Sequence, residues 1–520
     1  MCFKKNCIFV IYYLKFSVLD SVIDLIQQMT QGEKSFFRRK HHANPLPNYI
    51  ILYQTINKWK DRNEDYIKSK IDNLGMTNLA YVKHILLKNL LYSLTEYYRE
   101  EKELNILHEL DIIKILRRRG LMILASKKWE NVYKQCLEEG HATYMELLLL
   151  EKWQLNPTGS GNTGIKEHQK LVEFSTKHRL AFQNLLHIRS LTFQFKYLVK
   201  KSNLLYNDDK KFFSELCAEF NSLPKEIKLY NDEYKILANL TESYIYFLRQ
   251  EYLYALHVAE IIYEKIAVAE VYFFRHNEEF VLLFFKYYSE LLFINNKISA
   301  IIPLLEVINN HVFINERNLI QRDIISFLIE NKRLHKLYDY KKVEELYVHI
   351  KDKVDLWLKQ IIPEWKSLFL GSIAISAFVI GEQKKALFYL YRYEFSYIKS
   401  FRKEIVSFFN LFSVVIAYEI DDDEIFETTY QKAYMHFYQY KEYEMLFEGF
   451  IKALRKAFIS PSNEEEVILE EIIQNMQVLQ KKKSSKLIFS YFDFHSWLQA
   501  TKQKQSYAEY KQRFFGDLEH

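Results

Sequence analysis

Several residue clusters in this 520-residue sequence have types and spacings that could carry chemistry. Gly159, Gly161 and Gly164 satisfy the spacing G-x-G-x-x-G, which in a dinucleotide-binding domain places a pyrophosphate at the start of a helix. That use requires a preceding β-strand and an acidic residue about 20 positions later, but a helical pattern comes first and Asn184 lies at that distance. We therefore expect no nucleotide cofactor and interpret residues 156–164 as an exposed Gly-rich loop.

Candidate metal ligands and catalytic side chains do not assemble into a known pattern. The acidic run 421–423 falls at an expected interhelix turn, and consecutive acidic side chains rarely converge on one ion, so capping of the next helix explains the run more simply. Four histidines are isolated: His108, His141, His276 and His335. No HExxH, GxSxG or Cys-His-Asn layout surrounds them. We predict no metal, no cofactor, no catalytic residues and a protein that is not an enzyme, with a site dispersed over several repeats as the open alternative.

A basic cluster near the N-terminus is the strongest candidate binding signal. It comprises Arg38, Arg39, Lys40, His41 and His42. Residues 1–100 contain 15 Lys/Arg against 9 Asp/Glu, which accounts for the whole formal charge of +6. The cluster could contact phosphates or an acidic protein partner, or form a solvated helix end.

Residues 64–99 give a second reason to consider nucleic-acid binding. They predict a short helix, a turn and a second helix, an order that resembles a helix-turn-helix. The second helix is long and apolar through its C-terminal half, which is typical of a packing helix. We keep nucleic-acid binding as the alternative to a structural domain with a basic face.

Composition favours long helices, and the cysteine pattern favours a reducing compartment. Only 11 Gly and 7 Pro occur against 39 Tyr and 39 Phe, so turn residues are scarce while core-forming residues are abundant. The four cysteines form neither a disulfide framework nor a zinc-site spacing. The apolar run 7–14 is short for a secretory signal, and no later stretch reaches the length of a membrane span. We predict a cytoplasmic protein without a membrane partner.

Hydrophobic periodicity predicts an all-α chain with a degenerate repeat. Polar breaks begin near Asn207, Arg249, Asn295, Tyr338, Gly381 and Asp421, and each precedes an apolar helix face. Between roughly Leu185 and Phe437 the following positions recur every 43 to 45 residues: Phe212, Ala255, Ala300, Val343, Ala386 and Thr429. We interpret Ala255, Ala300, Val343 and Ala386 as repeat packing positions at which two helices cross closely.

The predicted organisation is an α-solenoid of antiparallel helix pairs that follows a small basic helical N-terminal domain. The segments are a possibly disordered extension, 1–18, the basic domain, 19–103, one or more helical hairpins, 104–155, the Gly-rich loop, 156–164, the helical repeats, 165–455, and C-terminal capping helices, 456–520. Each pair cannot bury its own apolar face, so neighbouring pairs must complete the core.

Two of these units resemble the tetratricopeptide repeat superfamily. Ala374 precedes the turn glycine Gly381 by seven positions, and Ala386 follows at the spacing of that family's small packing residue. Ser243, Ala255 and Ala259 repeat the arrangement. The period is longer than the family's 34 residues, and most of the turn glycines and closing prolines are missing. The resemblance implies a helical-hairpin repeat and transfers no ligand-binding residue.

The expected function is a non-catalytic interaction scaffold that holds a protein or peptide in a concave groove of the repeats. The alternative is a regulator in which residues 19–103 bind nucleic acid and the repeats sense a partner. The two alternatives differ in whether the basic cluster or the repeats make the main contact.

Overall fold

The computed structural model contains helices and the turns that join them in the residues it describes, and no strand occurs in that part. It describes residues 22–23, 25–27, 29–42, 45–59, 64–76, 78–99, 102–138, 142–155, 162–201, 207–227, 229–268, 274, 277–313, 316–361, 363–392, 403–439, 446–481, 488–489 and 491–515. The predicted N-terminal extension lies outside these residues. The all-α fold class predicted from the sequence is therefore confirmed.

The chain divides into two compact units, Met1–Ser175 and Thr176–His520. The division falls inside a 40-residue helix, α10 (Asn162–Lys201). Residues 156–161 of the predicted Gly-rich loop lie outside the described residues, and residues 162–164 belong to the first turn of α10. The helix thus includes the last three residues of the predicted loop.

The first unit contains two separate cores. The helices around the first core are α3 (Gln31–Lys40), α4 (Asn48–Lys58), α5 (Glu64–Asp72) and α6 (Leu79–Tyr97). The helices around the second are α7 (Lys102–Arg118), α8 (Met122–Glu138) and α9 (Ala142–Leu155). Leu52, Tyr53 and Leu86 are among the residues buried in the first, and Ile113 and Trp129 are among those in the second. A capping box between Thr30 and Glu33 starts α3.

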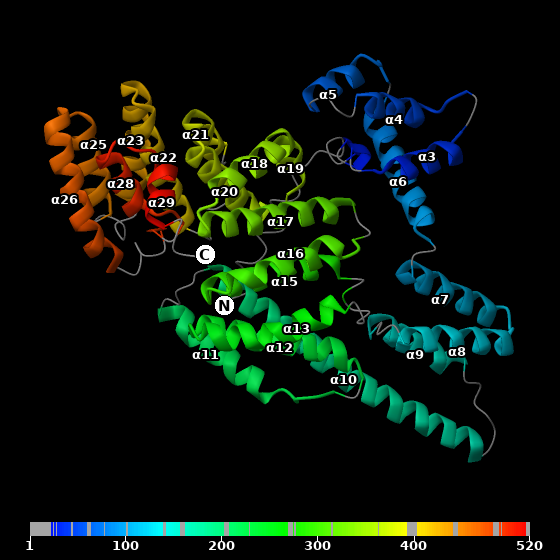
Figure 1. Cartoon of the computed structure of the whole chain (residues 1–520). Coiled ribbons are helices and arrows are strands. Elements are labelled where there is room, and N and C mark those ends of the chain that lie inside the picture. The colour runs from blue at the N-terminus through cyan, green and yellow to red at the C-terminus, as the bar shows by residue number, and fades with distance from the viewer. Residues whose placement is uncertain are drawn as a thin grey trace. The chain divides into compact units, whose positions relative to one another are not determined.

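The second unit contains successive antiparallel helix pairs (Figure 1). Its helices are the end of α10, α11 (Asn207–Ser222), α12 (Asn231–Leu248), α13 (Tyr252–Ala267), α15 (Glu278–Ile294), α16 (Ile301–Asn310), α17 (Glu316–Lys336), α18 (Tyr340–Ile350), α19 (Val354–Gln360), α20 (Pro363–Val379), α21 (Gln383–Tyr391), α22 (Lys403–Ile420), α23 (Asp423–Gln439), α25 (Lys452–Phe458), α26 (Ser462–Lys481), α28 (Phe494–Lys502) and α29 (Tyr507–Phe515). Between α12 and α23, the second helix of each pair packs against the first helix of the next.

One turn geometry joins the helices of these pairs. A residue one or two positions after the end of the first helix adopts the left-handed conformation, with φ between 54° and 85°, at Gln250, Asn296, Tyr338, Gly381 and Asp421. At the first four of these positions its N–H donates to the carbonyl three residues earlier, and the next N–H donates to the carbonyl five residues before itself. This Schellman arrangement satisfies the free carbonyls at a helix end. Four of the five turns use a residue other than glycine.

Side-chain hydrogen bonds join successive pairs at similar sequence separations. Asn331 Nδ2 donates to Ser372 Oγ at 2.8 Å, and the Ser376 hydroxyl donates to Asn331 Oδ1 at 2.9 Å. The hydroxyl oxygens of Ser243 and Tyr287 are 2.9 Å apart. These buried contacts cross from the first helix of one pair to the first helix of the next, so they fix the stacking of neighbouring pairs.

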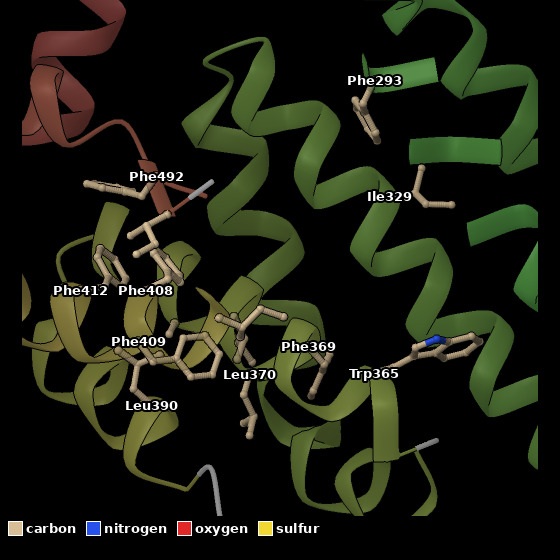
Figure 2. Packing of buried hydrophobic residues seen from close by; sticks show 14 of the residues in the cluster. Phe293, Ile329, Trp365, Phe369, Leu370, Leu390, Phe408, Phe409, Phe412 and Phe492 are labelled. Carbon is tan, nitrogen blue, oxygen red and sulfur yellow. The ribbon is translucent and has the colours of Figure 1, made fainter. Parts of the chain in front are cut away.

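Aromatic side chains fill the core between the later pairs (Figure 2). Phe408 and Phe412 of α22 stack with ring centroids 5.4 Å apart, and Phe492 lies 4.8 Å from Phe412. An added Cβ at Gly371 of α20 would meet the ring of Phe409 at 2.8 Å. The close approach of α20 and α22 therefore requires glycine at this position.

The C-terminal helices pack along the turn ends of several pairs. Trp497 Nε1 of α28 donates to Glu419 Oε1 at 2.7 Å. The Tyr507 ring of α29 lies 6.2 Å from that of Tyr340, and Lys511 Nζ lies 4.5 Å above the ring of Tyr338. The segment predicted to cap the stack thus contacts residues of α17 to α22. None of the described helices combines the length and the hydropathy needed to cross a bilayer.

Candidate functional site

A recess on the second unit lies between α10, α12 and α15. Each of these is the first helix of a successive helix pair. The volume of the recess is about 170 Å³. The lining residues are Arg189, Thr192, Phe193 and Lys196 of α10, Leu237, Leu240 and Tyr244 of α12, and Phe280, Leu283 and Phe284 of α15. We call this recess the α10–α12–α15 groove.

The floor of the groove is apolar. Leu237, Leu240 and Tyr244 are buried. The hydroxyl oxygens of Thr192, which lines the groove, and of Thr241 are 2.7 Å apart and join α10 to α12. Burial raises the pKa of the Tyr244 phenol well above its ordinary value, so this side chain stays neutral.

The rim of the groove carries an aromatic ring and an ion pair. The Phe193 side chain is 70 % exposed, an unusual position for so large an apolar group. Arg189 Nε donates to Glu233 Oε1 at 2.8 Å. Burial raises the pKa of the Glu233 carboxyl, and the attraction of Arg189 opposes this shift. A buried carboxyl thus holds the guanidinium in place at the rim.

The size and lining of the groove decide which ligands it suits. Sites for whole small molecules usually enclose about 300–1,000 Å³, so a recess of about 170 Å³ suits one apolar side chain of a larger partner. The lining supplies two cations, the hydrogen-bonded hydroxyl of Thr192, the phenol of the buried Tyr244, and otherwise apolar or aromatic groups. This arrangement can hold an apolar anchor with an acidic group beside it.

The predicted repeat packing positions lie in different environments. Ala255, Val343 and Ala386 are fully buried at the starts of α13, α18 and α21. Ala300 is only partly buried, because it ends a short 3-10 turn before α16. The outer position Phe212 is 38 % exposed, so its large ring does not occupy a close helix crossing.

The predicted basic cluster is partly occupied by contacts within the first unit. Lys40 pairs with Glu96, and the two nitrogens of His41 lie 3.2 Å from Tyr49 Oη and 3.0 Å from Ser93 Oγ. Burial, with the nearby Lys40 charge, lowers the pKa of His41, so its imidazole is neutral near pH 7.

Arg38, Arg39 and His42 are exposed at the end of α3. Arg38 Nε donates to the Lys34 carbonyl at 3.3 Å. The sequence contains five adjacent basic side chains. In the structure three of them, Arg38, Lys40 and His41, contact other residues of the first unit.

The other candidate residues cap a helix or lie buried among neighbouring side chains. Asp422 Oδ1 accepts the N–H of Ile425 at 3.0 Å, so this acid caps α23 as its turn position predicts. His335 lies 3.4 Å from the Ser376 hydroxyl, and burial lowers its pKa to about 4. Within the described ranges, no three His, Cys, Asp or Glu side chains are placed to hold a metal ion.

A larger surface hollow, of about 340 Å³, lies on the first unit. Its described lining comes from one helix, α6, through His84, Leu87, Lys88, Leu91, Tyr92 and Thr95. Because a single helix face supplies all of this lining, no second described element faces it to orient a ligand. It is therefore a weaker candidate than the α10–α12–α15 groove.

The groove residues were not identified from the sequence. Phe193 and Leu240 follow the same helical apolar pattern as core residues, and their convergence depends on how three helices stack. The only local signal is the apolar Phe193 between Arg189 and Lys196 on one helix. No family model, curated protein or solved structure matches the chain.

Proposed function

We propose that the chain is a non-catalytic interaction protein whose helix pairs form an α-solenoid and whose α10–α12–α15 groove binds a peptide segment of a protein partner. The observation that carries the proposal is an apolar groove with an exposed aromatic ring and a fixed arginine at its rim. Such a surface suits recognition of a side chain rather than its chemical conversion.

Two features support the solenoid part of the proposal. Five turns with a left-handed residue, four of them with the Schellman hydrogen bonds, recur along α12 to α23, and the pairs they join contact their sequence neighbours. Small side chains at Ala255 and Ala386 suit the close helix crossings of a helical-hairpin repeat, the arrangement that the tetratricopeptide resemblance implies. An array of this kind presents a continuous row of first helices as a binding surface.

The groove also favours a particular peptide chemistry. The apolar floor suits a leucine-sized or aromatic side chain, and Arg189 and Lys196 favour an acidic residue next to it. Glu233 already neutralises part of the arginine charge, so the apolar contact supplies more of the binding energy than the acid.

A peptide array tests the proposal directly. The purified full chain should bind a subset of array peptides that share an apolar residue beside an acid. Phe193→Ser should weaken those interactions by about ten-fold, the effect expected from losing one large apolar contact. Phe388→Ser is the matched control, because Phe388 is also well exposed but lies on α21.

Two results would overturn the peptide proposal. One is binding that lacks sequence preference or is unaffected by Phe193→Ser. The other is turnover in a broad hydrolase and transferase screen that a single polar substitution abolishes.

The second candidate function is nucleic-acid binding by residues 19–103. The exposed Arg38, Arg39 and His42 favour it, whereas the pairing of Lys40 and the neutral His41 reduce the available charge. Retention of duplex DNA or RNA by the full chain should then fall with salt and be lost when Arg38, Arg39 and Lys40 are changed to glutamate. Unchanged retention in that variant would exclude this candidate.

We also propose that the protein works in the cytoplasm. Cys136 and Cys217 are buried and form no disulfide with any residue that the structure describes, and burial raises the pKa of Cys217, which keeps it protonated and unreactive. Buried cysteines outside disulfides are typical of reducing compartments. Fractionation of the native cell would test this location.

A further inference from the structure

The turn between α7 and α8 exposes an uninterrupted run of residues, 118–124. Gly120 occupies the left-handed position of a Schellman turn, and Leu121 N donates to the Leu116 carbonyl at 3.0 Å. The side chains beyond it include Ile123, which is 88 % exposed. Five large apolar residues around this turn are exposed: Ile115, Leu121, Met122, Ile123 and Leu124. We call residues 115–124 the α7–α8 tip.

The tip is surrounded by positive charge. Residues 112–129 contain six cations and no acid: Lys114, Arg117, Arg118, Arg119, Lys127 and Lys128. Three of these have carboxylate partners, in the pairs Lys114–Asp111, Arg117–Glu151 and Lys128–Glu109. Arg118, Arg119 and Lys127 are exposed, and the structure gives them no ion pair among the residues it describes. The exposed cations therefore flank the apolar run on both sides.

We propose that the α7–α8 tip docks onto an anionic lipid surface, with its apolar side chains in the outer hydrocarbon region and its cations at the phosphates. Charge complementarity selects anionic headgroups, since the tip offers cations and no acid. The apolar side chains supply the contact that a purely electrostatic association lacks.

The shape of the tip favours lipid over one face of a protein. Met122, Ile123 and Leu124 are successive in the first turn of α8 and point about 100° apart, so they spread over about 200° of the helix circumference, and only the direction of Ala125 is buried. A folded partner presents a surface on one side of a protruding turn, whereas fluid lipid surrounds it. Lys127 and the arginines have long stems that allow their charged ends to remain at headgroup depth.

The core beneath the tip holds it in position. Ala125 and Trp129 follow the exposed run on α8 and are buried, and Trp129 Nε1 donates to the Leu148 carbonyl of α9 at 2.7 Å. Ile113 is buried on α7. Docking therefore requires no unfolding, and a peripheral contact of this kind needs no membrane-spanning helix.

This surface is separate from the α10–α12–α15 groove and does not depend on the function proposed for it. Variants of the tip and of the groove can be tested in the same purified protein. Failure of either proposal leaves the other to be judged on its own variants.

Vesicle flotation of the full chain tests the inference. We expect the protein to float with vesicles of phosphatidylcholine and phosphatidylglycerol, to bind phosphatidylcholine vesicles at least ten-fold less, and to dissociate as salt rises. Ile123→Ser should reduce binding to anionic vesicles by about ten-fold. The double change Arg118→Ser with Arg119→Ser should reduce it by about 25-fold, since each surface cation contributes about five-fold.

Matched variants separate the tip from general effects of charge and hydrophobicity. Val312→Ser removes a side chain that is 80 % exposed in the second unit, and Lys170→Ser with Lys177→Ser lowers the charge equally on α10. Both should bind as the wild type does. Circular dichroism should show unchanged helix content in every variant, because all the altered side chains are exposed.

Three outcomes would overturn the proposal. They are absence of binding to anionic vesicles, binding that Ile123→Ser leaves unchanged, and equal loss in the control variants. Salt-sensitive retention of duplex RNA or of an acidic protein, without vesicle binding, would likewise assign the cations to a different partner.

Discussion

Removing the glycine of one inter-helix turn should lower the stability of the protein, and introducing glycine into another turn should raise it. At Gly381, φ is +85° and an added Cβ would have no atom within 4 Å, so Gly381→Ala introduces backbone strain without a clash. The left-handed conformation costs an L-residue about 1–2 kcal/mol, and the reduced freedom of alanine in the unfolded chain offsets about 0.4–1 kcal/mol. We expect the free energy of unfolding to fall by about 1 kcal/mol.

Gln250→Gly reverses this change at an exposed position where φ is 64°. The free energy of unfolding should rise by up to about 1 kcal/mol. Tyr338→Gly is a useful contrast, because it relieves the same backbone strain but removes the ring that lies 4.5 Å from Lys511 Nζ. We therefore expect Tyr338→Gly to be less stabilising than Gln250→Gly.

Urea denaturation followed by circular dichroism would measure these effects. A change of midpoint without a change of slope reports altered stability of the same folded state. If Gly381→Ala were neutral, or if Gln250→Gly were destabilising, left-handed backbone strain would not determine how these two turns contribute to stability.

Three further substitutions test packing, capping and titration. Gly371→Ala should destabilise by about 1–3 kcal/mol because the new Cβ would meet the Phe409 ring, and the loss should be smaller in a Phe409→Leu background. Asp422→Ala should lower the urea midpoint by the equivalent of about 1 kcal/mol through loss of the cap on Ile425, whereas Asp422→Asn should retain stability. The folded pKa of His335, about 4, lies below its ordinary 6.5, so stability from the neutral imidazole is complete above pH 6.5 and is lost as pH falls toward 4. Wild type should lose up to about 3 kcal/mol more than His335→Gln between these pH values, and parallel pH profiles would contradict the assignment.

The turns were located from the sequence, but their shared geometry was not. Polar breaks near Arg249, Asn295, Tyr338 and Gly381 mark the places where the structure turns. Only the last contains glycine, and asparagine, which also tolerates the left-handed conformation, occurs at Asn296. Gln250 and Tyr338 give no such sequence sign. Tertiary packing of the two helices imposes the conformation at a modest local cost.

The candidate sites were harder to predict, because each depends on contacts between distant residues. The sequence shows Lys40 in a basic cluster but cannot show that Glu96, 56 positions later, neutralises it. The apolar residues after Gly120 fit a helix pattern and look like core, although most of the first turn of α8 is exposed. Local pattern identifies a helix and its apolar residues, while the neighbouring elements decide which of them reach solvent.

The hydrogen bonds between successive pairs also bear on how the second unit folds. Asn331 bonds to residues 41 and 45 positions away, and Ser243 and Tyr287 are 44 positions apart. When a helix pair packs onto a folded neighbour, these hydrogen bonds therefore close a loop of nearly constant length. The entropic cost of closing that loop does not grow with the number of pairs already folded. The contact between Trp497 and Glu419 spans 78 positions and encloses α23, α25 and α26, so we expect it to form after these helices. Folding should therefore spread between neighbouring pairs and end with the docking of α28.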